Sequence, residues 1–485
     1  MVSLRKCGYP QNTDPGGKLQ NTSRERQRGE CRDRPNELLG QLLGRLALCN
    51  VLIALSISST VGAATPPSSV PAFVGHAAPT CDGENGYQAA FGGRRTFLWR
   101  PDWLARTKAR LTTDSRLKPP YDALIARADN ALAGPRYSVI DKRTTPPSGD
   151  KHDYMSIGPY WWPDPEHPEG PYIRHDGEVN PGRNTDDFDS TRFDRMSSAV
   201  EALGLAYYFT HDARYARKAA ELLRTWFLDP ATRMNPNAQF AQGVPGRTTG
   251  RAEGVLDTFR LLRVIESVGL LAPSKTLTDA DQGGLEQWFS HYIDWMTSSP
   301  TGKQEQAAGN NHGLWFDRQV MEFALFAHRR DVAKAVLAAS PGSRVDRQIQ
   351  PDGKLPEELS RTRALHYTVF ALEALAGSAE IGRCFGVDLW RYQSPDGRGM
   401  RQAIDFLASY VGREKEFPYT ELHPEETHDT FALLRLAAWA YDDHSLSEKA
   451  ETLSGGNATD LVQLLIPPQR NASRGPAVSH NSPGR

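Results

Sequence analysis

Helical periodicity is the feature that most constrains how this chain can fold. Between positions 101 and 441, apolar residues recur at i, i+3 and i+4 spacing, as in "AVEALGLAYYF" and "TVFALEALAGSAEI". This spacing places apolar side chains on one face of an α-helix. It predicts helices over residues 101–111, 119–133, 195–209, 213–227, 252–268, 279–298, 313–327, 330–339, 365–381, 400–411 and 427–441. Strand patterns are few, so we expect an all-α protein.

Short turns join the predicted helices into pairs. Segments such as "FTHDARY" and "LDPATRMNPN" contain residues that interrupt helices. There are too many helical hairpins for a four-helix bundle, and no motif recurs at the ~34- or ~40-residue periods of common helical solenoids. We therefore predict an incomplete α/α barrel, the α/α toroid, built of helical hairpins with long functional loops at one rim.

The first 64 residues are typical of a targeting segment. A basic stretch precedes an apolar run over residues 46–57, and small residues follow up to Ala63 and Ala64. This pattern indicates a secretory signal cleaved near Ala63 or Ala64, or else an N-terminal membrane anchor. We expect a periplasmic or secreted protein.

The rest of the chain divides by composition. Residues 65–92 are rich in Pro, Ala, Ser and Gly and are predicted to be a linker, residues 93–466 form the toroid domain, and residues 467–485 form a disordered tail. Outside the targeting segment the cysteines are Cys81 and Cys384. They could pair in an oxidising compartment.

Charge and spacing exclude several classes of partner. The chain has 57 Lys and Arg against 58 Asp and Glu, so it lacks the basic excess of a nucleic-acid-binding protein. No further apolar stretch reaches the ~20 residues of a membrane span. The sequence contains no CxxC pair and no zinc-type spacing, so we expect no metal and no cofactor.

An aromatic segment, residues 149–181, interrupts the helical pattern. Its sequence, "GDKHDYMSIGPYWWPDPEHPEGPYIRHDGEVNP", places aromatic residues among prolines, where a helix cannot continue. Aromatic rings on a fixed loop can form flat platforms for the apolar faces of sugar rings; the alternative is that they fill the core under the loop. The candidate substrate-binding residues here are Tyr154, Tyr160, Trp161 and Trp162.

Two loop-to-helix junctions carry polar residues that capping alone does not require. In "GNNHG", Asn310 or Asn311 can cap the following helix, whose N-terminus attracts anions. His312 would donate a hydrogen bond to the same anion. The second junction, "PEELSRTRALHY", carries arginines before Tyr367, and nearby cations are expected to lower the pKa of a tyrosine from about 10.

Three of these motifs resemble those of a known enzyme family. "KHDYMSIGPYWWPDP", "GNNHG" and "PEELSRTRALHY" resemble the alginate-lyase-domain polysaccharide lyases, most closely family thirty-eight and more distantly family five, over residues 97–441. Those families have an α/α toroid and cleave uronic-acid polymers by β-elimination without a required metal. The resemblance implies that Asn311 and His312 face the substrate carboxylate, that Arg361 assists and that Tyr367 transfers the proton.

Further substrate contacts are expected around these four residues. Gln239 stands where relatives are expected to have asparagine, and Glu305 is expected to orient His312. The set of candidate substrate-binding residues outside the aromatic segment is Gln239, Glu305, Arg363 and His366. Basic residues near both junctions would attract a polyanion locally; these are Arg247, Arg251, Arg344, Arg347, Lys354, Arg361 and Arg363.

The chemistry of β-elimination explains why these residue types are needed. Removing the C5 proton of a uronate builds negative charge beside a carboxylate, and one well-placed donor to developing charge contributes ~3–4 kcal/mol. A base must reach C5, and an acid must protonate the leaving C4 oxygen. In β-linked mannuronate and glucuronate both atoms lie on one face, so a single tyrosine suffices. The sequence thus favours polymannuronate (alginate) or β-1,4-glucuronan as substrate.

Two other functions fit parts of the pattern. A glycoside hydrolase on the same toroid would need two opposed carboxylates, and Glu305 with Glu357 or Glu358 are the candidates. A non-catalytic glycan-binding protein would keep the aromatic segment and would have no need of the Asn-His and Arg…His-Tyr residues.

Overall fold

A computed structural model describes residues 96–423, 428–454 and 458–469. The predicted targeting segment and linker, residues 1–64 and 65–92, lie outside the described residues. None of the helices in the described ranges combines the length and the hydropathy that a membrane crossing requires.

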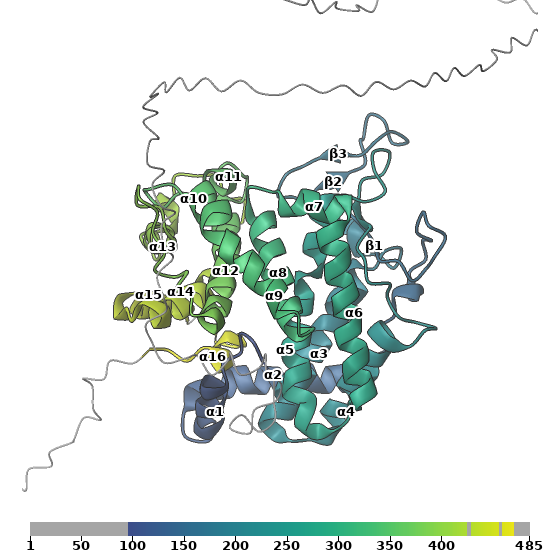
Figure 1. Ribbon diagram of the computed structural model, residues 1–485, viewed down its shortest axis with the longest axis horizontal. Helices are drawn as coiled ribbons and strands as arrows, with labels where there is room; N and C mark the ends of the chain where they lie inside the picture. The colour runs from purple at the N-terminus through teal and green to yellow at the C-terminus, as the bar shows by residue number, and fades with distance from the viewer. Residues whose placement is uncertain (1–95, 424–427, 455–457, 470–485) are drawn as a thin grey trace, which may run out of the picture. The chain divides into compact units, whose positions relative to one another are not determined.

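The predicted helices are present, and they confirm the all-α class (Figure 1). The main α-helices are α1 (Pro101–Arg110), α2 (Lys118–Ala133), α3 (Ser190–Thr210), α4 (Ala213–Leu223), α5 (Leu261–Leu271), α6 (Asp279–Ser298), α8 (Asn311–Phe326), α9 (Arg330–Ser340), α12 (Ala364–Gly382), α13 (Met400–Ala408), α14 (His428–Tyr441) and α15 (His444–Ser454). One prediction is wrong in kind: residues 252–260 form a 3-10 helix, η7 (Ala252–Arg260), before α5 begins.

Side chains at the helix starts explain several of these boundaries. Helix α6 begins with a capping box, in which the Thr278 side chain accepts from the Asp281 N–H and the Asp281 carboxylate accepts from the Thr278 N–H. Helix α8 begins where the Asn310 side chain accepts a hydrogen bond from the His312 N–H. The short α7 (Pro300–Gln306), which the periodicity does not predict, starts with a proline and a serine cap.

The buried helices α3 and α5 run in the same direction. Near the start of both, the Arg263 guanidinium donates to the Asp194 carboxylate at 3.0 Å. Farther along, Gly204 lies so close to Ser267 that a Cβ at position 204 would come within 2.8 Å of the Ser267 Cβ. The matching order of these contacts along both helices makes the pair parallel.

Helices α8 and α12 are also parallel neighbours. The indole N–H of Trp315 donates to the Phe370 carbonyl at 3.1 Å, and the Arg318 guanidinium donates to the Glu373 carbonyl at 3.2 Å. The return helices α4 and α9 pack on the outside of α3 and α8, respectively. This alternation of parallel inner helices and outer return helices is the predicted α/α toroid, and it gathers the inner N-termini at one rim.

The long aromatic segment lies at this rim and contains short strands (Figure 1). Strand β1 (Met155–Ile157) pairs in parallel with β4 (Phe240–Gly243), and β2 (Trp161–Trp162) pairs antiparallel with β3 (Ile173–Arg174). The strands are too short to form a separate layer, so their role is to fix the loop against the helices.

A buried aspartate, Asp257 of η7, anchors the base of this segment. Its carboxylate accepts hydrogen bonds from the Tyr154 hydroxyl at 2.9 Å and the Ser156 hydroxyl at 2.6 Å. It also accepts from Arg183 and Gln242. Burial opposes ionisation of Asp257, but the Arg183 charge and these donors outweigh burial and lower its pKa. The prediction that Tyr154 forms a sugar platform is wrong, because its side chain is fully buried on Asp257 and Phe193.

Two further expectations concern the edges of the domain. Cys384 is disulfide-bonded, whereas Cys81 lies outside the described residues. The predicted tail begins at residue 467, yet the Pro467 carbonyl accepts a hydrogen bond from the Trp439 indole at 2.7 Å. The ordered domain therefore extends to at least 469, because Gln469 donates to Asp442.

Candidate active site

His312 lies in the first turn of α8 and is held by Glu305. Its Nδ1 lies 2.7 Å from Glu305 Oε1, and the side chain of His312 is 15% exposed while that of Glu305 is 2% exposed. Burial disfavours the imidazolium, but the Glu305 carboxylate outweighs burial, so the pKa of His312 is raised. Because Nδ1 is engaged, Nε2 is the ring nitrogen left to meet a substrate, and it is a donor when the ring is protonated.

Asn311 precedes this histidine and is completely buried. Its backbone N–H donates to Glu358 Oε1 at 2.5 Å, and its side-chain amide donates to Glu358 Oε2 at 2.8 Å. Glu358 belongs to α11 (Pro356–Leu359), the short helix that precedes the second junction. The first and second junctions are therefore in direct contact through Asn311 and Glu358.

Arg361 and Tyr367 form the second half of the site. The Arg361 guanidinium carbon lies 3.8 Å from the centre of the Tyr367 ring, and the Arg361 backbone N–H donates to the Glu358 carbonyl. Arg361 and His312 both act as nearby positive charges that lower the pKa of Glu358, against the larger effect of burial, which raises it. Contacts through Glu358 thus link Asn311, which precedes His312 in α8, to Arg361 and Tyr367.

The Tyr367 hydroxyl donates a 2.5 Å hydrogen bond to the Tyr160 hydroxyl of the aromatic segment. Burial and the neighbouring Tyr160 raise the pKa of Tyr367, and the Arg361 charge opposes this only in part. The prediction that cations lower this pKa below its ordinary value is therefore wrong, because the desolvation of a 6% exposed ring outweighs one guanidinium.

Asp176, which the sequence did not single out, fastens the aromatic segment to the second junction. Its carboxylate accepts two hydrogen bonds from Arg361, at 3.0 and 2.8 Å, and one from the Thr362 hydroxyl. Partial burial raises the pKa of Asp176, but Arg361 outweighs it and brings the pKa to about 2. The following Gly177 has φ +84 and lies against Thr362, where a Cβ would come within 2.6 Å of the hydroxyl. This turn requires glycine.

The two tryptophans of the segment are half-buried at the same rim. The Arg247 guanidinium carbon lies 5.3 Å from the centre of the Trp161 ring, and the Trp162 indole donates to the Glu178 carbonyl at 2.9 Å. Each ring is thus fixed on one side and partly exposed on the other. Such fixed aromatic surfaces can receive the apolar face of a sugar ring.

Arg251, predicted from the sequence only as a residue that would attract a polyanion, acts on the site itself. Its guanidinium donates to the Gln242 side-chain oxygen at 2.7 Å and to Glu253 at 3.0 Å. Its charge also acts on both Glu305 and His312. No local sequence signal indicated this placement, because Gln242, the partner of Arg251, is buried with φ +48 in β4, and only the structure shows this.

Three further candidate substrate-binding residues are Arg363, His366 and Gln239, and their roles stay predictions; the His366 ring centre lies 5.3 Å from that of Tyr367. Arg363 is 7% exposed and lies 4.0 Å from Glu421, and the His366 ring stacks on Phe370 with an interplanar angle of 8°. Gln239 is exposed, and its backbone N–H donates to the side chain of Asn237. Of the two arginines at the second junction, Arg361 is the one whose guanidinium covers the Tyr367 ring, whereas Arg363 accepts the Tyr367 N–H with its backbone carbonyl.

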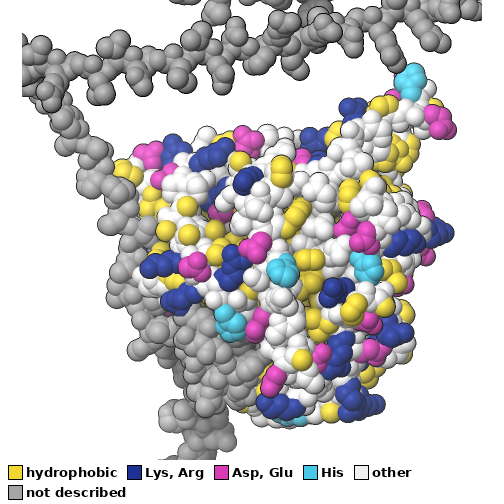
Figure 2. Space-filling view, turned by 45° about the vertical axis from the view of Figure 1, so that its right-hand side comes forward, with side chains coloured by type: hydrophobic (Ala, Val, Ile, Leu, Met, Phe, Trp, Pro, Cys, Tyr) yellow, Lys and Arg dark blue, Asp and Glu magenta, His cyan; other side chains and the backbone are white. Residues whose placement is uncertain are grey.

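Most of the basic residues expected to attract a polyanion are paired with carboxylates. Arg344 is buried and donates to Asp317 at 2.7 Å, and Arg361 is bound by Asp176. On the face shown in Figure 2, Lys and Arg side chains are interspersed with Asp and Glu side chains. Attraction of a polyanion must therefore come from single residues at the rim, such as Arg247 beside Trp161.

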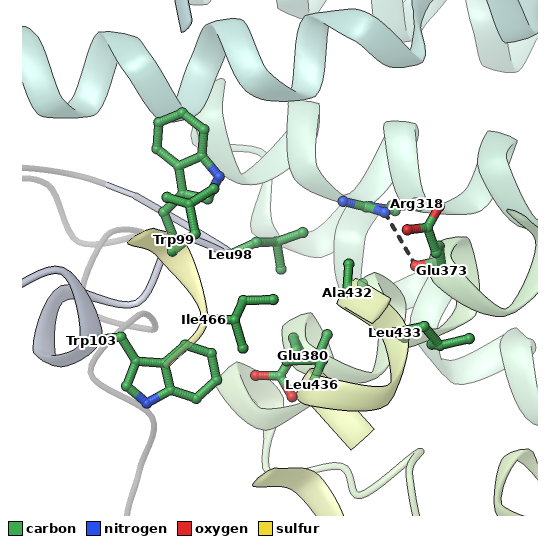
Figure 3. Close-up of a pocket in the computed structure, with 13 residues that line it drawn as sticks. Leu98, Trp99, Trp103, Arg318, Glu373, Glu380, Ala432, Leu433, Leu436 and Ile466 are labelled. Carbon is green, nitrogen blue, oxygen red and sulfur yellow. Dashed lines mark hydrogen bonds between the residues drawn. The ribbon is translucent and has the colours of Figure 1, made fainter. Parts of the chain in front are cut away.

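A separate cavity lies farther along α8 and α12, away from the helix starts that carry His312 and Tyr367 (Figure 3). Arg318 and Glu373 contribute to its wall and are joined by a hydrogen bond. Its other lining residues are mainly apolar and come from residues 98–103, α12, α14 and the region of α16 (Val462–Leu465). They include Leu98, Trp99, Trp103, Leu433, Leu436 and Ile466. This cavity is distinct from the site at the rim.

Comparisons with known proteins agree with this arrangement. The alginate lyase family model matches residues 138–417. An alginate lyase from Bacteroides ovatus of known crystal structure is 37% identical, covers 77% of this chain and 99% of its own, and superimposes with a TM-score of 0.74.

Curated relatives match a shorter stretch. Alginate lyases from Pseudomonas syringae pv. tomato and Pseudomonas entomophila are each 34% identical, over 111 and 112 residues. These matches cover 22% and 23% of this chain and 27% and 29% of the relatives, so the chain spans about a quarter of their length. Because the family model extends over more than half of the sequence and includes both junctions and the aromatic segment, the chain belongs to the alginate lyase family.

Proposed function

We propose that the protein is a polysaccharide lyase that cleaves alginate by β-elimination, with β-linked mannuronate at the cleaved bond. One observation carries the proposal: Asn311, which precedes His312, is hydrogen-bonded to Glu358, the Glu358 carbonyl accepts the Arg361 N–H, and the Arg361 guanidinium covers the Tyr367 ring. A phenol next to several donors for an anion is the arrangement that proton abstraction beside a carboxylate requires.

Neutralising the substrate carboxylate is the first task of the site. Glu305 binds Nδ1 of His312, so the Nε2–H of the protonated ring is the donor for the substrate carboxylate. The Asn311 amide has two N–H donors, of which Glu358 takes one. The Arg361 charge lies on the same side as Tyr367, so the negative charge that develops at C5 forms beside a cation.

Proton transfer is the second task, and we assign it to Tyr367. Because its pKa is raised, only a small fraction of Tyr367 is ionised at neutral pH, and this phenolate is the reactive form. The phenolate takes the C5 proton, the C5 electron pair forms the C4–C5 double bond, and the C4–O bond breaks. The Tyr367 phenol then returns the proton to the departing glycosidic oxygen. Tyr367 begins and ends the cycle in the same state, and the products are an unsaturated uronate end and a free hydroxyl.

The carboxylates of the site do not favour hydrolysis. Glu305 Oε1 is bound to His312, and both oxygens of Glu358 accept from Asn311, so both carboxylates already hold residues of the site. Glu357 is exposed. A hydrolase needs an opposed acid and base with access to the bond, and these contacts support elimination instead.

Assays on a panel of uronate polymers test this function. The purified protein is incubated with polymannuronate, polyguluronate and β-1,4-glucuronan, and the ultraviolet absorbance of unsaturated ends is followed. We expect the fastest increase with polymannuronate. A faster reaction with β-1,4-glucuronan would show that glucuronan, which has the same stereochemistry, is the preferred substrate. New reducing ends without ultraviolet absorbance would refute elimination.

Two finer assignments accompany this proposal. Placement in polysaccharide lyase family thirty-eight, rather than family five, rests on the long motif "KHDYMSIGPYWWPDP". A periplasmic or secreted location rests on the signal-like composition of residues 1–64. N-terminal sequencing of the exported protein, with cleavage near Ala63 or Ala64, tests the second assignment.

A further inference from the structure

Glu358 binds one residue of the site with both of its carboxylate oxygens. The side chain is 1% exposed, with Oε1 2.5 Å from the Asn311 backbone nitrogen and Oε2 2.8 Å from the Asn311 amide nitrogen. A buried carboxylate is costly unless several donors satisfy it. Two hydrogen bonds to a single neighbouring residue fix that residue in both position and rotation.

The other end of the same amide shows why this rotation matters. Asn311 Oδ1 is buried and has no hydrogen-bond partner among the described residues. A rotated amide would place this oxygen against the Glu358 carboxylate and lose a charge-assisted hydrogen bond. Glu358 therefore selects the orientation in which the amide N–H₂ group lies on its side of the site, at the expense of an unsatisfied acceptor.

The helix that carries Glu358 also fixes the second junction. The Arg361 backbone N–H donates to the Glu358 carbonyl at 3.1 Å, so one turn of chain sets the positions of both Asn311 and Arg361. The charges of Arg361 and His312 both act on the Glu358 carboxylate. A change at Glu358 thus reaches the anion-binding donors directly and Tyr367 only through Arg361.

We propose that Glu358 is a positioning residue for the reaction: it holds the buried Asn311 with its carboxylate and Arg361 with its backbone carbonyl, and thereby positions the donors of both junctions for the substrate carboxylate. This inference rests on the proposed lyase function. It also gives Glu358 a role other than that of a hydrolytic acid.

A double-mutant cycle tests this coupling. The variants are Asn311→Ala, Glu358→Gln and the double variant, and kcat and KM are measured on the polymer that the wild type cleaves best. Glutamine presents an N–H₂ group to one of the two Asn311 donors and loses that hydrogen bond. Each single change is expected to lower kcat on the order of 10²-fold, as for removal of one donor to developing charge.

The cycle has a clear expected outcome. In the Asn311→Ala background, Glu358→Gln is expected to change kcat by less than about threefold, because residues that act as a unit are not additive. Glu357→Gln, one position earlier and exposed, is the matched control and is expected to keep the wild-type kcat. Unchanged turnover in Glu358→Gln, or losses that multiply fully in the double variant, would overturn the proposal.

A second variant guards against loss of folding. Glu358→Asp keeps the charge but is one methylene shorter, so it reaches one of the two Asn311 donors. We expect a smaller loss of kcat than in Glu358→Gln. The thermal melting temperature of each variant is measured alongside. An equal or larger loss in a folded Glu358→Asp protein would contradict positioning by charge. A wild type that produces no unsaturated ends from any uronate polymer would refute the proposed function itself, a result separate from any difference between variants.

Discussion

The hydroxyl group of Tyr367 donates a 2.5 Å hydrogen bond to that of Tyr160, which lies 207 residues earlier in the chain. The bond joins the start of α12 to the aromatic segment, and the Arg361 guanidinium covers the Tyr367 ring at 3.8 Å. The ring and the hydroxyl of Tyr367 are therefore each fixed by a different element. A proton-transferring group must be held in this way to reach C5 and the C4 oxygen in succession.

Tyr367→Phe is expected to abolish elimination without unfolding the protein. It removes the proton-transferring oxygen, for which losses of roughly 10²–10⁴-fold or more are typical, and one hydrogen bond worth about 1 kcal/mol. Absorbance assays and thermal melting measure the two effects. Tyr441→Phe is the matched control, because that buried hydroxyl donates to the Trp390 carbonyl away from the site. Turnover in Tyr367→Phe equal to that of the Tyr441→Phe control would contradict the assignment.

Glu305→Gln is expected to shift the pH profile of kcat/KM toward lower pH on its alkaline side. The Glu305 carboxylate outweighs burial and raises the pKa of His312, so the imidazolium persists to higher pH in the wild type. Without that charge, His312 loses its proton at lower pH and ceases to donate from Nε2. The profile is measured for both proteins on one polymer; an alkaline side that does not move would show that the protonated ring is not required.

Asp176→Asn is expected to destabilise the protein by about 1 kcal/mol at neutral pH, a figure reduced for solvent screening. Because the folded-state pKa of Asp176 is lowered to about 2 from 3.8, its contribution is complete above pH ~4 and is lost as the pH falls from ~4 to ~2. The measurement is the free energy of unfolding of both proteins against pH.

The control for this prediction is Glu169→Gln, an exposed position in the same segment. We expect no pH-dependent difference from the wild type for this variant. A stability difference for Asp176→Asn that persists unchanged down to pH 2 would contradict an ionic attachment of the segment to Arg361.

Glu322→Gln is expected to gain stability relative to the wild type as the pH rises from 5 to 8. Glu322 and Glu266 are buried neighbours, and burial raises the pKa of both, that of Glu266 to about 7. The folded protein keeps protons that the unfolded chain releases above about 4.5, so wild-type stability falls with rising pH. The Glu322→Gln variant lacks one of these two acids, so its free energy of unfolding falls less with rising pH. The free energy of unfolding of both proteins is measured at pH 5 and at pH 8. The same difference between variant and wild type at both pH values would refute the prediction.

The sequence predicted those parts of the structure that depend on local pattern. Apolar spacing located the helices to within a few residues, and the Asn310 cap marks the start of α8. Where apolar spacing coexists with a 3-10 conformation, as in η7, periodicity alone does not distinguish the two. Short helices such as α7 have too few residues to show a period.

Local sequence pattern could not predict the long-range contacts at the site. Asp176 and Arg361 lie 185 residues apart, and nothing local in either segment indicates their pairing. Tyr154 was misjudged because a loop aromatic can face either the core or the solvent, and only the buried Asp257 decides between them. The raised pKa of Tyr367 depends on its burial, which its neighbours in sequence do not reveal.

The most direct test of elimination is the fate of solvent oxygen. The purified protein is incubated with polymannuronate in water enriched in the heavy oxygen isotope, and the products are weighed by mass spectrometry. Elimination uses no water, so we predict that fragments with a new non-reducing end are lighter than the corresponding hydrolysis products by one water molecule. In samples reduced with borohydride before the C1 hydroxyl exchanges with solvent, we predict no heavy oxygen in the products. Saturated products that have gained one heavy oxygen per cleaved bond would contradict the account.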